Sequence, residues 1–512
     1  MGRDECSEPK GEGSVLPLKI HMRRSPTVAI AWVARAALCL MVSTQPAVAE
    51  DSAVARELNR QFKDVTAKNR TSGAILAAFL KMTPPPFEVG DDFDQGTIWP
   101  KMEGWPKVSA WAKSNAAMGQ ALVDSQFGLV FGLGYGDGAV DGAIAKAGLQ
   151  IKLGDGADVA QIQYGYFRAI RTIGAFATAE MYRLGEAGDY AGSFKVGLAY
   201  ARLLRQVCEQ SMLEEKLFAL EALAEALSIH RDFMFTYLKG LPVDLMKQVA
   251  LKEYSFLRPS DNERMRRLQM PEGDRIVTEA VLKQALTAST GSDIDADNFA
   301  QVVGAQESDE GALQRFNTQE MWRRVSQVHG SLEASNDKLL DVYDDWWRRW
   351  RVRPFTAWHQ VPTEFSRANP IKYAAVLAMV RDMDRAFAWR NVIIAEVNGT
   401  VMAAGLCGYY NEFKATWPKD RERAYAVFFQ KRFDFDPFDK TYGRLQYRAL
   451  GAERQAIETP LGRVWATGCM VWALGANNED ESGEKHSTDA SDGDLLIWPP
   501  VRALAREEGL LK

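Results

Sequence analysis

The 512-residue chain is poor in histidine and cysteine, with five of each. These side chains perform much of nucleophilic catalysis and bind most transition metals. The motifs that combine them are missing as well: there is no Cys-x-x-Cys, no His-Glu-x-x-His, no Ser-His-Asp order, no Gly-x-Ser-x-Gly elbow and no Walker loop. The sequence therefore argues against a histidine-rich metal centre. Carboxylate chemistry stays open, because it needs no histidine.

A strongly basic segment is also missing. The chain has 62 Lys and Arg against 67 Asp and Glu, for a formal net charge of −5, and these charges are spread along its length. Nucleic-acid binding needs a concentrated basic surface, so we expect no nucleic-acid partner. The glycine-rich stretch 128–142 has no clear strand before it, and we interpret it as a connector instead of a phosphate-binding loop.

The N-terminal residues have the pattern of an export signal. Residues 22–25 are basic, residues 26–42 are mostly apolar, and Ala47-Val48-Ala49 provides an A-x-A cleavage site. We interpret residues 1–49 as an upstream extension and signal peptide, with the true start at Met22. The protein is then periplasmic or secreted, in a Gram-negative-type envelope. An uncleaved anchor is the alternative, although the apolar run is short for a span. No second stretch is long and apolar enough by this reading of the sequence, so we expect no transmembrane span after cleavage.

Three cysteines remain after residue 49, namely Cys208, Cys407 and Cys469. At most one disulfide can form among them. Cys407 and Cys469 are the favoured pair because both belong to the C-terminal region, although spacing does not establish geometry. An exported chain of this length can also depend on its core alone.

Apolar residues recur at helical spacing through most of the chain, which predicts a mainly α fold. We expect a helical-hairpin body with a small C-terminal α+β module. The predicted regions are 50–150, helical with the glycine-rich connector; 151–370, the helical-hairpin body; and 371–512, a long helix and the small β module. Within the first region we predict one helix over 51–82 and another over 111–130. Asn398-Gly399 is a candidate interruption of the long helix.

The body contains a hairpin signal around Gly185, Gly188 and Asp189, where one helix ends and the next begins. The pattern is similar to a single tetratricopeptide-type hairpin, but no second copy follows at a period of about 34 residues. The next predicted helix, 211–239, carries several acidic residues that we expect on the surface, because exposed glutamate favours helices. They are Glu214, Glu215, Glu221 and Glu225.

Trp346, Trp347 and Trp350 alternate with charged residues in a helical segment that ends near residue 353. Exposed, they would suit a membrane-surface helix or a carbohydrate-stacking face. We favour a buried stripe, because positions i and i+4 lie on one helix face. The Asp-rich run 293–297 lacks the glycine and glutamate of an EF-hand loop, and predicts a polar turn and a helix cap.

The tail from 433 to 500 combines a turn at Asp436-Pro437, strand-like segments at 442–448 and 464–474, and an acidic loop at 477–494. The loop has seven acidic and almost no apolar residues, so burial cannot order it. A calcium ion, which takes six to eight oxygen ligands, would order it. A solvated acidic loop without an ion is the alternative.

The order of these motifs, after Tyr409-Tyr410 and Trp417-Pro418, resembles the C-terminal part of the major pseudopilins of type II secretion. It also resembles the tail of large helical secreted proteins of unknown function from planctomycete-like bacteria. The resemblance covers about 371–500. It implies a pilin-like module and bound calcium, with the backbone carbonyls of Leu474 and Glu479 and the side chains of Asn477, Asp492 and Asp494 as ligands. Asn477 replaces the family's usual aspartate and the loop is longer, so weaker calcium binding is implied. The pilin processing site is absent.

These observations lead to one preferred function and two alternatives. We expect an exported helical scaffold or interaction protein with a calcium-ordered C-terminal loop and an unknown envelope or secreted protein partner. The first alternative is a periplasmic hydrolase that acts on a glycan or envelope polymer through a carboxylate pair, with Trp346, Trp347 or Trp350 lining its cleft. The second is an accessory role in secretion or envelope assembly, which rests on the tail resemblance alone.

Overall fold

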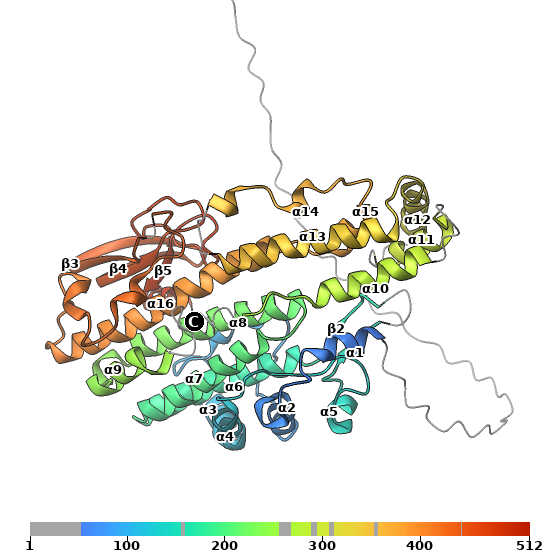
Figure 1. Ribbon diagram of the computed structural model, residues 1–512. Helices are drawn as coiled ribbons and strands as arrows, with labels where there is room; N and C mark the ends of the chain where they lie inside the picture. Colours follow the sequence, from blue (N-terminus) through green and yellow to red (C-terminus); the bar gives the residue numbers. More distant parts are fainter. Residues whose placement is uncertain are drawn as a thin grey trace, which may run out of the picture. The chain divides into compact units, whose positions relative to one another are not determined.

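The computed structural model describes residues 53–154, 159–254, 268–287, 294–306, 312–352, 357–441 and 443–511. The predicted signal peptide and the start at Met22 lie outside these residues. The fold is mainly helical and has a small C-terminal antiparallel sheet, which confirms the predicted fold class (Figure 1).

The N-terminal region consists of short helices instead of the two predicted long ones. The helix expected over 51–82 is divided in two. In the segment between the two helices, Arg70 Nε donates a hydrogen bond to the Val65 carbonyl at 3.0 Å. The helix expected over 111–130 begins earlier and is divided at Asn115. The elements are α1 (Ala53–Arg60), α2 (Ser72–Phe79), the 3-10 helix η2 (Gln95–Thr97), α3 (Trp105–Ser114), α4 (Ala116–Ser125), α5 (Gly142–Lys146) and the paired strands β1 (Ile151–Lys152) and β2 (Gln163–Tyr164).

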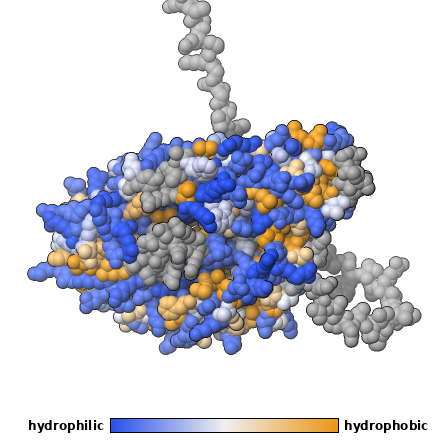
Figure 2. All heavy atoms as spheres, viewed as in Figure 1, coloured by the Kyte–Doolittle hydropathy of each residue, from blue (hydrophilic) through white to orange (hydrophobic). Residues whose placement is uncertain are grey.

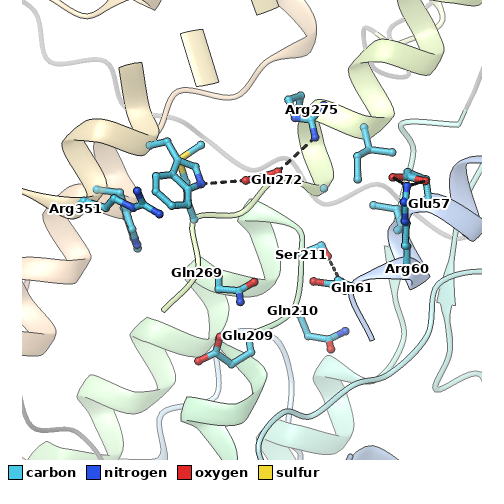
Figure 3. Close-up of a pocket in the computed structure, with 16 residues that line it drawn as sticks. Glu57, Arg60, Gln61, Glu209, Gln210, Ser211, Gln269, Glu272, Arg275 and Arg351 are labelled. Atoms are coloured by element: carbon cyan, nitrogen blue, oxygen red, sulfur yellow. Dashed lines mark hydrogen bonds and ion pairs between the residues drawn. The ribbon is translucent and has the colours of Figure 1, made fainter. Parts of the chain in front are cut away.

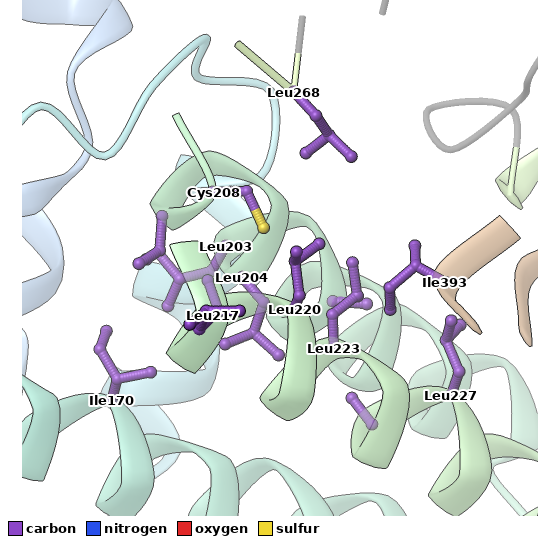
Figure 4. Packing of buried hydrophobic residues seen from close by; sticks show 14 of the residues in the cluster. Ile170, Leu203, Leu204, Cys208, Leu217, Leu220, Leu223, Leu227, Leu268 and Ile393 are labelled. Atoms are coloured by element: carbon purple, nitrogen blue, oxygen red, sulfur yellow. The ribbon is translucent and has the colours of Figure 1, made fainter. Parts of the chain in front are cut away.

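The predicted hairpin is present as α6 (Phe167–Glu186) and α7 (Tyr190–Val207). Asp189 caps α7 by accepting a hydrogen bond from the Gly192 N–H at 2.9 Å. The next helix, α8 (Leu213–Thr236), packs against α7, and leucines from both fill the space between them (Figure 4). Leu204, Leu220 and Leu223 are fully buried. Each such leucine stabilises the fold by about 1.5–3 kcal/mol.

The rest of the body includes α13 (Leu332–Arg351), on which Trp346 and Trp350 are buried as predicted, while Trp347 is half-buried. Asp295 caps α11 through the Asp297 and Asn298 N–H groups, which confirms the predicted polar cap. The remaining helices of the body are α9 (Val243–Leu251), α10 (Gly273–Thr287), α11 (Ala296–Gly304), α12 (Ala312–Ser326), α14 (Glu364–Arg367) and α15 (Ala374–Met379).

The helix α16 (Asp384–Glu412) packs against α8 and α9 and also against the C-terminal sheet. Asn398 and Gly399 do not interrupt it. Asn398 donates to the Phe435 carbonyl at 2.8 Å, and Gly399 lets Ile497 approach the helix backbone. The stretch Ala374–Glu412 passes the length and hydropathy test for a membrane span, contrary to our expectation, but its apolar window is entirely buried in the protein. It is a core helix here.

The C-terminal sheet has the order β3 (Gln446–Thr459), β4 (Gly462–Ala473) and β5 (Leu495–Trp498), all antiparallel, followed by α17 (Val501–Glu507). Figure 1 shows this sheet beside α16. The favoured disulfide is not formed: Cys407 on α16 and Cys469 on β4 are both buried and free. Burial raises the pKa of the Cys469 thiol, and the neighbouring Cys407 adds to the effect.

On the face shown in Figure 2, hydrophobic residues form small patches separated by hydrophilic ones. Isolated exposed apolar side chains are normal for a folded protein surface. The cavities and the acidic loop are therefore the features that could carry a function.

Candidate functional site

The five residues predicted to bind calcium have separate hydrogen-bond and ion-pair partners. Asp494 is fully buried and accepts from the Gly483 N–H at 2.8 Å. Asp492 is exposed and lies 3.3 Å from the Lys485 ammonium. The side-chain amide of Asn477 bonds to Glu481 at 2.7 Å, and its oxygen accepts from the Glu479 N–H at 3.2 Å. The Leu474 N–H donates to Asp436 at 2.9 Å, which fixes the start of the loop.

One carboxyl that the sequence analysis did not select does approach a predicted ligand. Glu481 and Asp494 lie within hydrogen-bonding reach of each other. Glu481 Oε2 and Asp494 Oδ1 are buried, and neither has a hydrogen-bond donor in the described part of the chain. Burial, together with the nearby Glu481 and Asp480, raises the pKa of Asp494 to about 8. Two carboxyls whose facing oxygens are buried need a shared proton or a cation between them.

The structure places Asp494 beside Glu481, whereas Asp492 faces Lys485. Within the ranges that the structure describes, no group of three or more His, Cys, Asp or Glu side chains is placed to hold a metal ion. A calcium ion at this pair would need backbone carbonyls and water for its remaining ligands.

A larger cavity of about 900 Å³ lies between α1, the α7–α8 connection, the start of α10 and the end of α13 (Figure 3). We call it the tryptophan cavity. Its volume is in the usual range for small-molecule sites. Trp347 and Trp350 provide aromatic surface, and the polar lining consists of Glu57, Arg60, Gln61, Glu209, Gln210, Ser211, Gln269, Glu272, Arg275 and Arg351.

Each carboxylate in the tryptophan cavity has an arginine partner. Glu57 pairs with Arg60 at 3.3 Å and Glu209 with Arg205 at 2.9 Å. Glu272 pairs with Arg275 at 3.4 Å, and it also accepts from the Trp347 indole N–H at 3.0 Å (Figure 3). The cavity therefore presents neutralised charge pairs, amides and indole surface.

A second cavity of about 280 Å³ lies where α8, α16, α17 and the end of the acidic loop meet. We call it the carboxyl cavity, because Asp94, Glu221, Glu225 and Glu396 all line it. The expectation of a surface position is wrong for Glu215, which is fully buried under Tyr135 and Tyr166. Glu225 is half-buried and accepts from the Gln95 N–H at 2.8 Å.

No family model, curated protein or solved structure matches this chain. The resemblance of the tail to pseudopilins therefore stays a prediction from the residues at 371–500.

Proposed function

We propose that the protein is an exported helical binding protein that holds a saccharide in the tryptophan cavity. The observation that carries this proposal is the lining of a 900 Å³ cavity by Trp347 and Trp350 together with three glutamines and a serine. Sugars present an apolar ring face and a rim of hydroxyl groups. The indole surface of a tryptophan can pack on the apolar ring face, and side-chain amides can form hydrogen bonds with the hydroxyl groups.

The charge pattern favours a neutral ligand. Glu57, Glu209 and Glu272 are each paired with an arginine, so the cavity has no large excess of either sign. Polar groups that are already fixed by partners are preorganised to bind hydroxyls. The N-terminal leader pattern supports export to the envelope, where saccharide polymers are exposed.

The test is titration of the purified protein with neutral tetrasaccharides (cellotetraose, chitotetraose and maltotetraose), followed by tryptophan fluorescence and calorimetry. We expect one of them to bind, and we expect Trp347→Ala to weaken it about tenfold or more, because a buried aromatic contact dominates such sites. Trp465→Ala, on the outside of β4, is the matched control and should bind normally. Equal affinity for Trp347→Ala and the wild type would contradict the proposal.

Hydrolysis of the same saccharide is the second candidate. Glutamates and tryptophans line one cavity, as the hydrolase hypothesis requires. The pairing of these glutamates with arginines favours saccharide binding over general-acid catalysis, because a carboxylate paired with an arginine resists protonation. Release of new reducing ends in the titration mixtures would establish hydrolysis, and its absence would leave binding alone.

We also propose that calcium orders the acidic loop through Glu481 and Asp494. The two unpartnered buried oxygens support this. A cation bound only by the folded protein stabilises it by mass action. Calcium should therefore raise the melting temperature relative to EGTA, and Glu481→Gln should abolish the rise. Glu479→Gln, on the exposed side of the loop, should keep it. No shift in the wild type would refute calcium binding.

A further inference from the structure

Glu225 differs from the other carboxyls of the carboxyl cavity because it has no arginine ion pair within the described ranges. Asp94 pairs with Arg502 at 2.6 Å, and Glu396 pairs with Arg231 in a buried contact between α16 and α8. Glu221 pairs with Arg385. The direct partners of Glu225 are the Gln95 N–H, at 2.8 Å, and the Asp94 carboxyl.

Several charged and titratable groups surround Glu225 in the cavity. Burial raises the pKa of Glu225 to about 7; Arg502 opposes the rise and Asp94 adds to it. His486 is held neutral by burial, with its pKa lowered to about 4. The titratable and charged groups that face Glu225 across the cavity are Asp94, Glu221, Arg231, Glu396, His486 and Arg502. With Glu225 itself the cavity holds four carboxyls, and Arg502, Arg231 and Arg385 pair with the other three, so within the described ranges Glu225 is the carboxyl without an arginine pair.

A second, independent feature concerns Arg231. It lines the cavity, is 2% exposed, and its Nε has no hydrogen-bond partner in the described part of the protein. Arg231 donates from Nη1 to Thr400 at 2.7 Å and to Glu396, so its guanidinium is fixed in place. A buried donor without a partner is costly unless an acceptor fills the position.

The remaining wall is apolar. Trp389 of α16 faces a group of aliphatic residues from the C-terminal module, which are Leu461, Leu495, Leu496, Val501 and Leu511. Such a wall removes apolar surface from water, and an indole ring also attracts a cation.

We propose that the carboxyl cavity binds a small organic cation, an ammonium with a neighbouring hydroxyl or carbonyl on an apolar body, with Glu225 as its counter-ion. The ammonium takes the place of the proton that Glu225 shares with Asp94. The hydroxyl or carbonyl accepts from Arg231 Nε. The aliphatic part lies against Trp389 and the leucines. This site is separate from the tryptophan cavity and does not depend on it.

Three related probes separate these contributions. Leucinol carries the ammonium, the hydroxyl and the aliphatic chain. In 4-methylpentane-1,2-diol a hydroxyl replaces the ammonium, and 4-methylpentan-2-amine lacks the hydroxyl. In calorimetry of the purified full chain we expect leucinol to bind, the amine to bind several-fold more weakly, and the diol not to bind. Failure of leucinol to bind, or equal binding of the diol, overturns the proposal.

The pH dependence tests the role of Glu225 directly. Only ionised Glu225 pairs with the cation, so leucinol should bind about tenfold more tightly at pH 8 than at pH 6. Binding at pH 6 should release a proton, which is measured as a dependence of the heat on the buffer. Affinity that does not change between pH 6 and pH 8 contradicts the proposal.

The matched variants are Glu225→Gln and Glu214→Gln, both on α8, and Glu214 lies outside the cavity, where it pairs with Arg381. Glu225→Gln should lose leucinol binding and its pH dependence, whereas Glu214→Gln should stay within about twofold of the wild type. Trp389→Leu, which leaves the Glu225 contacts intact, should weaken binding about two- to fivefold. Unchanged affinity in Glu225→Gln would overturn the proposal, and circular dichroism would establish that this variant is folded.

Discussion

At the scale of single residues, the chain is notable for polar side chains that are buried with partners far away in sequence. Glu215 of α8 is fully buried and accepts hydrogen bonds from Tyr166 at 2.7 Å and from Tyr135. Lys216, its neighbour, is also buried and donates to the Cys208 carbonyl. These contacts connect α8 to the N-terminal region, so we expect them to matter for stability.

Glu215→Ala should lower the free energy of unfolding by about 3 kcal/mol or more, since it leaves two buried tyrosine hydroxyls without their acceptor. Urea denaturation measures the change. Glu214→Ala is the matched control, because Glu214 is exposed and pairs with Arg381 on the surface, where ion pairs contribute about 0–1 kcal/mol. If both variants unfold at the same urea concentration, the buried network does not stabilise the fold.

Few of the individual residues in the candidate sites could be predicted from the sequence. Asp494 could be selected because its acidic loop lacks apolar residues. Glu481 could not be distinguished from the other acids of that loop. Asp94 and Glu225 are 131 positions apart, and only tertiary packing brings them together. Helix propensity predicts a solvated face for α8, and burial against neighbouring elements overrides it.

At the scale of elements, the local signals predicted most of the fold. Asp189 and the glycines around it predicted the α6–α7 hairpin, because capping is a local interaction. The continuity of α16 was harder to predict. Asn398 and Gly399 are poor helix formers, but their contacts with Phe435 and Ile497 come from the C-terminal module, which lies later in the chain. Between α1 and α2 the Arg70 side chain donates to the Val65 and Phe62 carbonyls, which helix periodicity alone does not predict.

Gly399→Ala should destabilise the protein by about 1–3 kcal/mol, because the added Cβ would lie 2.4 Å from Ile497 Cγ2 and push β5 off α16. Gly73→Ala in α2 is the matched control. A Cβ there meets no atom within 4 Å, so the substitution should stabilise by about 0.4–1 kcal/mol. Thermal unfolding should therefore show a lower melting temperature for Gly399→Ala and a higher one for Gly73→Ala than for the wild type. A stabilising Gly399→Ala would contradict the close packing of α16 on the sheet.

At the scale of the whole molecule, buried titratable groups are spread over distant parts of the chain. Burial raises the pKa of Glu215 and of Asp436 to about 7, and it lowers the pKa of His230 and of His486 to about 4. Carboxyls with raised pKa values bind protons more tightly in the folded state. Their contribution is present at low pH and is lost as the pH rises through about 7. The histidines contribute above pH 6.5 and lose that contribution as the pH falls towards 4.

The free energy of unfolding should therefore be higher near pH 5.5 than at pH 8. Asp494 and Glu225 also have raised pKa values, of about 8 and about 7, and destabilise the fold in the same direction as the pH rises. These four carboxyls outnumber the two histidines, which act in the opposite direction. Each fully buried carboxyl contributes a slope of up to about 1.4 kcal/mol per pH unit. Urea denaturation at several pH values checks this. A free energy that increases from pH 5.5 to pH 8 would show that these carboxyls are ionised in the folded protein.

The last helix, α17, connects the C-terminal module to the first half of the chain. Arg506 pairs with Asp232 of α8 across 274 positions, and Arg502 pairs with Asp94 across 408. During synthesis Asp94 and Asp232 are therefore added to the chain long before their arginine partners. These two ion pairs can form only after α17 has been made, so they close the C-terminal module onto the first half of the chain as a late event of folding.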